Sequence, residues 1–237
     1  VQHAVSFLLL EGERLLLHGI VDEVVTEETA ERGRTVRFRG RGYAARLLDN
    51  ESPPLVYQGV TLREILRRHV TPYGIRCRER AETKAEGEFT VAAGSSQWKV
   101  LEDFCRVYGG FTPRFDRYGE LLAAPERDSG ERLVIDDETE LLSLRRREDH
   151  YGVLSEVLVL DKSAGSQYIV RNEDFLRRGG SRRQVVCTPG RSTWQAMRYT
   201  GEYQIARSRE AEVELELTLP GIREAEPGET VELRRTG

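Results

Sequence analysis

The N-terminal third of the chain has the pattern of β-strands: two apolar-rich segments are followed by one in which apolar and polar residues alternate. Strands are predicted over Ala4–Leu10, Arg14–Val25 and Arg34–Tyr43. Gly40 and Gly42 in the third segment indicate a bulge or a tight barrel corner. The third segment separates its residues into an apolar face and a charged face, as a half-buried antiparallel strand does: Val36 and Phe38 against Thr35, Arg37, Arg39 and Arg41.

The hydrophobic period changes to that of a helix after a turn-rich boundary at 49–54. Thr61 and Glu64 have the spacing of a capping box, which predicts that a helix begins there. A second helix is predicted to begin at Ser95 or Ser96 and to end at Gly109-Gly110. The two apolar faces are formed by Leu62, Ile65, Leu66 and His69 in the first helix, and by Val100, Leu101, Phe104, Cys105 and Tyr108 in the second.

These two helical segments resemble each other. A shift of 35 positions aligns Thr61 with Ser96 and His69 with Phe104. Each helix leads into a short predicted strand, and the polar stretch 79–88 separates the two units. Two units are too few for a solenoid, so they predict a small α/β domain. The predicted strands that follow the helices are 75–78, 111–115 and, after a turn at 116–119 in which Gly119 supplies a left-handed residue, 120–124.

The pattern returns to β from residue 132 onward. Ser192 with Gln195 forms a further capping box and predicts a helix of roughly 17 residues. Glu212–Leu219 alternates strictly, with apolar residues on one side and glutamates on the other, and Thr230–Arg234 begins one more strand. The strands predicted before that helix are 133–135, 141–147, 153–160, 167–171 and 185–187.

Composition narrows the classes of protein that fit. Of the 237 residues, 38% are hydrophobic, which is enough to build a core. The net charge of −4 disfavours a dedicated nucleic-acid binder, and no apolar run approaches the ~18 residues of a membrane helix. The three cysteines, at 77, 105 and 187, are widely spaced, which argues against a disulfide framework and favours a reducing compartment. No secretory signal is expected.

Few residues in the sequence are candidates for catalysis or metal binding. Asp136-Asp137-Glu138 contains the carboxylates that an acid/base pair or a metal site needs. Consecutive residues on a strand point to alternate faces, so a solvated turn is favoured. The four histidines lack metal-ligand spacing, and His69 aligns with Phe104, which favours a packing role. Cys105 lies on the apolar face of its helix and is interpreted as part of the core.

An arginine-rich stretch extends from Arg171 to Arg198. It could contact anions or nucleic acid. Phe175 is the only aromatic residue among the loop arginines, which argues against a base-stacking platform. We therefore favour a solvated loop or a contact between subunits.

Seven segments follow one another in a distinctive order: His18–Val21, Arg41–Leu48, Tyr57–Leu66, Tyr73–Ile75, Ser96–Phe104, Tyr108–Gly110 and Asp116–Leu121. This order resembles that of the baseplate hub proteins of contractile-tailed phages, the Mu-like tail proteins and the late control protein D family. The resemblance covers roughly residues 15–235, is carried mostly by 57–122, and concerns a family whose members usually extend further at both ends.

The resemblance implies an α+β fold with two similar β-barrel domains and an inserted small α/β domain of two helix–strand units. The domain boundaries expected from it are 1–52 for the first β-barrel part, 53–126 for the α/β domain, and 127–210 for the second β-barrel part with one helix. Residues 211–237 are expected to complete the first barrel.

The resemblance also implies a structural role. Hubs of this family are homotrimers whose pseudo-sixfold ring joins the tail tube protein to the central spike protein, among other baseplate proteins. The expected location is the virion tail baseplate, after assembly in the bacterial host cytoplasm. No enzyme activity, catalytic residue, cofactor, metal, membrane or specific nucleic acid is expected.

Two alternatives remain open. One is a soluble hydrolase with an unrecognised carboxylate site that includes Asp136 and Asp137. The other is a hub or spike component of another contractile injection system. For the hub, we hypothesise that the arginine row at 37–41 and the glutamate row at 212–216 lie on intersubunit or tube-facing surfaces, because opposite charges set the register of an interface.

Overall fold

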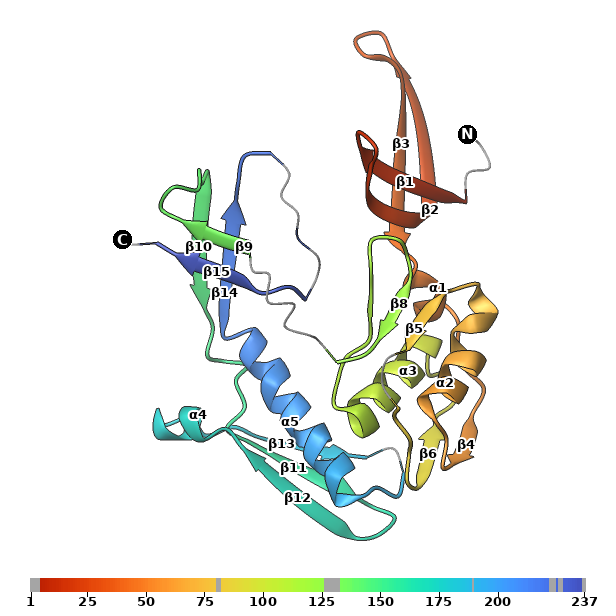
Figure 1. Cartoon of the computed structure of the whole chain (residues 1–237), viewed down its shortest axis with the longest axis vertical. Helices are drawn as coiled ribbons and strands as arrows, with labels where there is room; N and C mark the ends of the chain where they lie inside the picture. The colour runs from red at the N-terminus through yellow and green to blue at the C-terminus, as the bar shows by residue number, and fades with distance from the viewer. Residues whose placement is uncertain are drawn as a thin grey trace.

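A computed structural model describes residues 5–79, 82–125, 133–188, 190–221, 225 and 228–235. The fold is mixed α+β, with several small sheets (Figure 1). Among the described residues no sheet closes into a barrel. The chain forms two groups of strands on one side of the molecule, and two α/β units on the other.

The N-terminal sheet is antiparallel, with the order β1-β2-β3. Its strands are β1 (Ser6–Glu11), β2 (Arg14–Thr29) and β3 (Gly33–Gly42), which confirms the predicted strands. β1 pairs with β2 only as far as Ile20. The rest of β2 and its partner β3 therefore project beyond β1 as a two-stranded ribbon (Figure 1).

The bulge predicted from the glycines of β3 lies where the projecting ribbon begins. The register of β2 shifts between Val21 and Glu23, opposite Gly40. A Cβ atom at Gly40 would lie 2.2 Å from the carbonyl oxygen of Ile20 and 2.6 Å from the ring of Phe7. Only glycine permits this approach of backbone and ring.

The first α/β unit follows, and its two predicted helices, α2 and α3, begin where expected. The hydroxyl of Thr61 accepts from the backbone N–H of Glu64, whose carboxylate accepts from the backbone N–H of Thr61 in return. Ser96 accepts from the backbone N–H of Lys99. The elements are α1 (Ala45–Leu48), β4 (Leu55–Gln58), α2 (Leu62–His69), η1 (Thr71–Tyr73), β5 (Cys77–Glu79), β6 (Glu88–Val91), α3 (Gln97–Phe104), η2 (Cys105–Gly109), β7 (Arg114–Phe115) and β8 (Leu121–Ala123).

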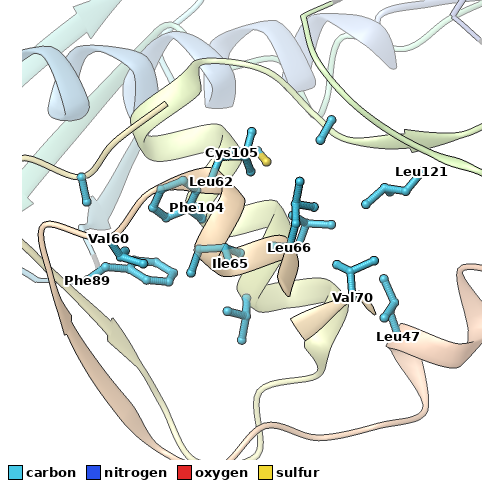
Figure 2. Packing of buried hydrophobic residues seen from close by; sticks show 14 of the residues in the cluster. Leu47, Val60, Leu62, Ile65, Leu66, Val70, Phe89, Phe104, Cys105 and Leu121 are labelled. Atoms are coloured by element: carbon cyan, nitrogen blue, oxygen red, sulfur yellow. The ribbon is translucent and has the colours of Figure 1, made fainter. Parts of the chain in front are cut away.

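The apolar faces of α2 and α3 pack together in the main hydrophobic core (Figure 2). The Phe89 ring of β6 meets the Phe104 ring edge-on, with 5.4 Å between their centroids. Each large side chain buried in this way contributes about 1.5–3 kcal/mol. The predicted helix faces are confirmed, because these residues are fully buried: Leu62, Ile65, Leu101, Phe104 and Cys105.

The second α/β unit consists of a three-stranded sheet with the order β12-β11-β13, against which α5 packs. A Cβ at Gly201 of α5 would lie 2.3 Å from Val170, so the helix approaches the sheet closely there. The elements are β11 (Glu156–Asp161), β12 (Ser166–Arg171), α4 (Glu173–Arg177), β13 (Arg183–Cys187) and α5 (Trp194–Glu210).

Four strands form the second β group. β10 (Ser143–Glu148) pairs antiparallel with β14 (Val213–Thr218), and β9 (Leu133–Asp136) pairs parallel with β15 (Val231–Arg234). We refer to the first pair as the β10–β14 ribbon.

This pairing differs from the expected domain organisation. Residues 211–237 were expected to complete the first β part, but their strands pair with β9 and β10. The strands between 156 and 187 form their own sheet under α5, separate from β10. The alternation of apolar and polar residues predicts which face of a strand is apolar. It does not predict which distant strand pairs with that strand.

Candidate assembly surfaces

The β10–β14 ribbon exposes an apolar face. Leu144 pairs across the strands with Leu217, and Arg146 pairs with Leu215, so their side chains share one face. Leu144 and Leu215 remain 45% and 43% exposed, and Val213 lies on the same face. Contiguous exposed apolar residues on a strand mark an interaction surface.

The projecting ribbon of β2 and β3 has a comparable face. Val24 pairs with Phe38, and Thr26 pairs with Val36, which places these side chains on one side. Phe38 is 47% exposed. Two separate ribbons thus present apolar side chains that this chain alone does not cover.

The opposite faces of both ribbons are charged. Arg39 of β3 lies 3.3 Å from Glu23 of β2. In the other ribbon, Arg145 of β10 lies 3.6 Å from Glu216 of β14. The predicted arginine and glutamate rows are therefore each flanked by residues of opposite charge in the same chain. Such exposed pairs contribute only about 0–1 kcal/mol to stability.

Arg41 anchors the base of β3. Its guanidinium donates to both carboxylate oxygens of Asp22 and to both of Asp49, at 2.7–3.0 Å. These hydrogen bonds lower the pKa of both carboxyl groups and raise the pKa of Arg41. The contact ties the ribbon to the loop before β4.

The N-terminal sheet meets the first α/β unit at a junction centred on His18. Its backbone N–H donates to the carbonyl of Arg117 at 2.9 Å, and its Nε2 lies 3.0 Å from the hydroxyl of Tyr43. Gly119 has φ of +76°, and a Cβ there would lie 2.6 Å from the Tyr43 ring. The left-handed glycine predicted in this turn is confirmed, and it also lets Tyr43 pack against the turn.

A cleft of about 240 Å³ opens beside this junction, lined by residues that include Leu17, His18, Tyr43 and Phe115. The junction residues come from three segments that are distant in the sequence: 18–21, 41–48 and 116–121. The order of these segments carried the resemblance, but their convergence could not be read from the sequence.

A second junction joins the two α/β units: the Arg106 guanidinium of η2 lies over the Tyr203 ring of α5, 5.2 Å from its centroid. Within the second unit, the buried Asp161 accepts from the backbone N–H groups of Ser192, Ser163 and Ala164 at 2.8–3.0 Å. Burial acts to raise the pKa of Asp161, but the three hydrogen bonds outweigh it and the pKa is lowered. Nearby, burial raises the pKa of Tyr108 to about 12, and its hydroxyl donates to the carbonyl of Glu88.

The acidic cluster lies in the turn after β9. The carboxylate of Asp136 accepts from the hydroxyl and the backbone N–H of Thr139 and from the backbone N–H of Glu138. The bond from the Thr139 hydroxyl does most to lower the pKa of Asp136. Asp137 and Glu138 are exposed. Over the part of the chain that the structure describes, no group of three His, Cys, Asp or Glu residues could hold a metal ion.

His69 and Cys105 are both buried in the main core. Burial lowers the pKa of His69 and raises the pKa of the Cys105 thiol. A thiol held protonated is a poor nucleophile. His18 belongs to the junction described above, His150 lies near Glu148 and Glu212, and His3 lies outside the described residues.

Several arginines of the arginine-rich stretch pair with acidic residues of the same chain. Arg171 and Arg183 both contact the Glu156 carboxylate, at 3.2 and 2.6 Å. Arg178 lies 2.6 Å from the buried Glu212 and lowers the pKa of that carboxyl group. These three guanidinium groups are paired within the same chain, which spacing in the sequence does not reveal.

Comparison with known structures shows what the fold is similar to. A tail protein from Neisseria meningitidis MC58 matches over 97% of this chain and 73% of its own, with a TM-score of 0.77 and 16% identity. The 43 kDa tail protein of prophage MuSo2 from Shewanella oneidensis matches over 96% and 73%, with a TM-score of 0.72 and 18% identity. At such identities the similarity concerns the fold.

A third similar structure is the prophage tail protein gp18 from Listeria monocytogenes EGD-e. It matches over 87% of this chain and 64% of its own, with a TM-score of 0.53 and 11% identity. No protein-family model and no curated protein matches the sequence. Among the described helices, none combines the length and the apolar character needed to cross a bilayer.

Proposed function

We propose that this chain is a structural component of a phage or prophage tail. The observation that carries the proposal is a fold similar to that of a tail protein over 97% of the chain. The exposed apolar faces of the two ribbons support it, because a protein that acts by assembly must leave such surfaces for its neighbours.

More specifically, we propose a baseplate hub. Three copies form a pseudo-sixfold ring that joins the tail tube protein to the central spike protein, with other baseplate proteins around it. Each copy contributes two barrel-like modules, one built on β1–β3 and one on β9, β10, β14 and β15. Their common plan supports this: each contains a ribbon with one apolar face and one face of paired charges, and both lie on the same side of the molecule (Figure 1).

The proposed role is assembly without catalysis, in the virion tail baseplate. The proposal is supported by the surroundings of the residues that a hydrolase could use, which are buried or already hydrogen-bonded. Asp136 is bound by its own turn, Cys105 is buried and protonated, and His69 is hydrogen-bonded inside the core.

The first test is the mass of the protein in solution. Light scattering should give three times the 27.0 kDa of one chain, about 81 kDa, and electron microscopy should show rings with threefold symmetry. A protein that stays monomeric at high concentration would contradict the hub proposal.

A matched pair of variants tests whether the apolar face is the one that assembles. Leu215→Glu places a charge on the apolar face of β14, and Thr218→Glu places one on the opposite face of the same strand. Leu215→Glu should abolish the trimer while the folded content seen by circular dichroism is kept. Thr218→Glu should leave the trimer intact.

A further inference from the structure

Each of the two ribbons has one acidic strand and one basic strand. In the projecting ribbon, β3 contains no acidic residue, and the part of β2 that pairs with it beyond the bulge contains no basic residue. In the β10–β14 ribbon, β14 contains no basic residue and β10 carries three consecutive arginines. The charges are Asp22, Glu23, Glu27 and Glu28 on β2; Arg34, Arg37, Arg39 and Arg41 on β3; Arg145, Arg146 and Arg147 on β10, with Glu148 at its end paired to Arg146; and Glu214 and Glu216 on β14.

One edge of each ribbon lacks a strand partner. Within the described ranges, β3 pairs only with β2, and β14 pairs only with β10. The carbonyls of Glu212 and Thr218 accept from backbone N–H groups on the β10 side. Because backbone groups alternate along an antiparallel strand, those of Val213, Leu215 and Leu217 are directed to the free edge. Such an edge is a template for another strand.

We propose that the free edge of β3 pairs with the free edge of β14 from a second copy of this chain, so that the two ribbons form one continuous sheet. The pairing rests on the proposed assembly of copies into a ring, and it specifies which edges meet. Figure 1 shows the two ribbons standing apart within one chain, so the partner strand belongs to another copy.

The charges of the four strands would then alternate in sign across the shared sheet. The order is acidic β2, basic β3, acidic β14 and basic β10. Arg37 and Arg39 would lie beside Glu214 and Glu216, and opposite charges on neighbouring strands stabilise pairing by about 0.2–1 kcal/mol for each pair. On the other face, Phe38 and its neighbours would continue into the apolar face of β14.

The charges also exclude the alternative pairing of like edges. Two β3 edges would bring arginine rows together, and two β14 edges would bring glutamate rows together, both of which are destabilising. A two-fold dimer is therefore disfavoured. The β3–β14 contact joins different surfaces of the two copies, and repetition of such a contact gives a ring when the rotation between copies closes after three steps, as the proposed trimer requires.

A charge exchange tests the pairing. Arg37→Glu with Arg39→Glu, and separately Glu214→Arg with Glu216→Arg, should each weaken the trimer by about tenfold or more in sedimentation equilibrium, because like charges would meet at the edge. The chain with all four changes restores opposite signs and should recover most of the wild-type association. As a control, Arg67→Glu with Arg76→Glu changes the same number of exposed arginines on the first α/β unit and should leave association unchanged.

The outcomes separate this inference from the function it rests on. If the wild type forms trimers but the four-change chain is no better than either double variant, the β3–β14 pairing is wrong and the trimer stands. If the wild type forms no trimer, the hub proposal itself fails. Equal circular dichroism and thermal midpoints among the variants exclude unfolding as the cause. A Val36→Cys, Leu217→Cys chain should also give intermolecular disulfides on oxidation, and a lack of them would overturn the pairing.

Discussion

The hydroxyl of Tyr57 lies 2.8 Å from Nε2 of His69. On the other side of the ring, Nδ1 lies 2.7 Å from Oε1 of Gln97, whose Nε2 donates to the carbonyl of Glu51. The amide oxygen can only accept, so Nδ1 carries a proton, and in the neutral ring Nε2 accepts from Tyr57. Burial lowers the pKa of His69 and so favours this neutral form.

The stability of the protein should consequently depend on pH through His69. Burial holds its pKa in the folded state below the ordinary 6.5, against a smaller opposing effect from Gln97. The stabilisation is complete above about pH 6.5 and is lost as the pH falls towards the folded pKa, because the unfolded chain then binds more protons. Urea unfolding of the wild type should give a lower free energy at pH 5.0 than at pH 7.5. His69→Gln should reduce this difference. Equal pH dependence in the two proteins would contradict the assignment.

The bulge at Gly40 makes a sharp prediction for the N-terminal sheet. Gly40→Ala should destabilise the protein by about 1–3 kcal/mol, because the new Cβ meets the carbonyl oxygen of Ile20 at 2.2 Å. Gly42→Ala on the same strand meets nothing within 4 Å and should stay within about 0.5 kcal/mol of the wild type. Urea denaturation of the two variants measures the difference.

Substitution of Phe104 should affect folding stability, whereas substitution of Phe38 should affect association. Phe104 is fully buried between α2 and β6, and Phe104→Ala should cost about 3–5 kcal/mol of unfolding free energy. Phe38 is 47% exposed on the projecting ribbon. Phe38→Ala should change the thermal midpoint little but weaken the proposed trimer in light scattering. A large loss of stability from Phe38→Ala would mean that this face already packs within one chain.

At the start of α5, the neighbouring side chains of Ser192 and Thr193 have different roles. Thr193 caps the helix by accepting from the backbone N–H of Ala196, whereas the hydroxyl of Ser192 donates to the carbonyl of Gly190. Thr193→Ala should cost about 1 kcal/mol, and Ser192→Ala should cost less than half of that. Thermal unfolding of the two variants would show the reverse order if Ser192 were the cap.

The cysteines should differ in their reactivity. Cys187 is exposed, whereas Cys105 is buried with its pKa raised by burial. A maleimide reagent added to the native protein should label Cys187 within minutes and leave Cys105 unlabelled until urea is added. Mass spectrometry of the digested protein identifies the labelled sites, and labelling of native Cys105 would contradict the core assignment.

The cap of α5 also shows where the sequence was informative. The predicted capping box of Ser192 with Gln195 does not form, because Thr193 is the N-cap, but the helix itself lies within one residue of its predicted start and has the predicted length, since helical spacing is a local property. β4, β6 and α4 were not predicted; they have four, four and five residues.

Long-range relationships were the part that the sequence could not supply. The strict alternation of 212–219 indicated a strand with an apolar face and a glutamate face, and β14 confirms it. Its neighbour was expected to be in the N-terminal part and proved to be β10. Likewise His18 and Tyr43 each belonged to a recognised segment, but only the fold shows that they meet.

The pairing of β10 with β14 also determines when the ribbon can form during synthesis. Glu148 pairs with Val213, and the whole second α/β unit lies between them in the chain. Contacts between such distant residues form late, because the intervening loop must first be closed. The nascent polypeptide therefore acquires its acidic edge only after α5 has left the ribosome, whereas the basic edge of β3 (Gly33–Gly42) is synthesised long before it.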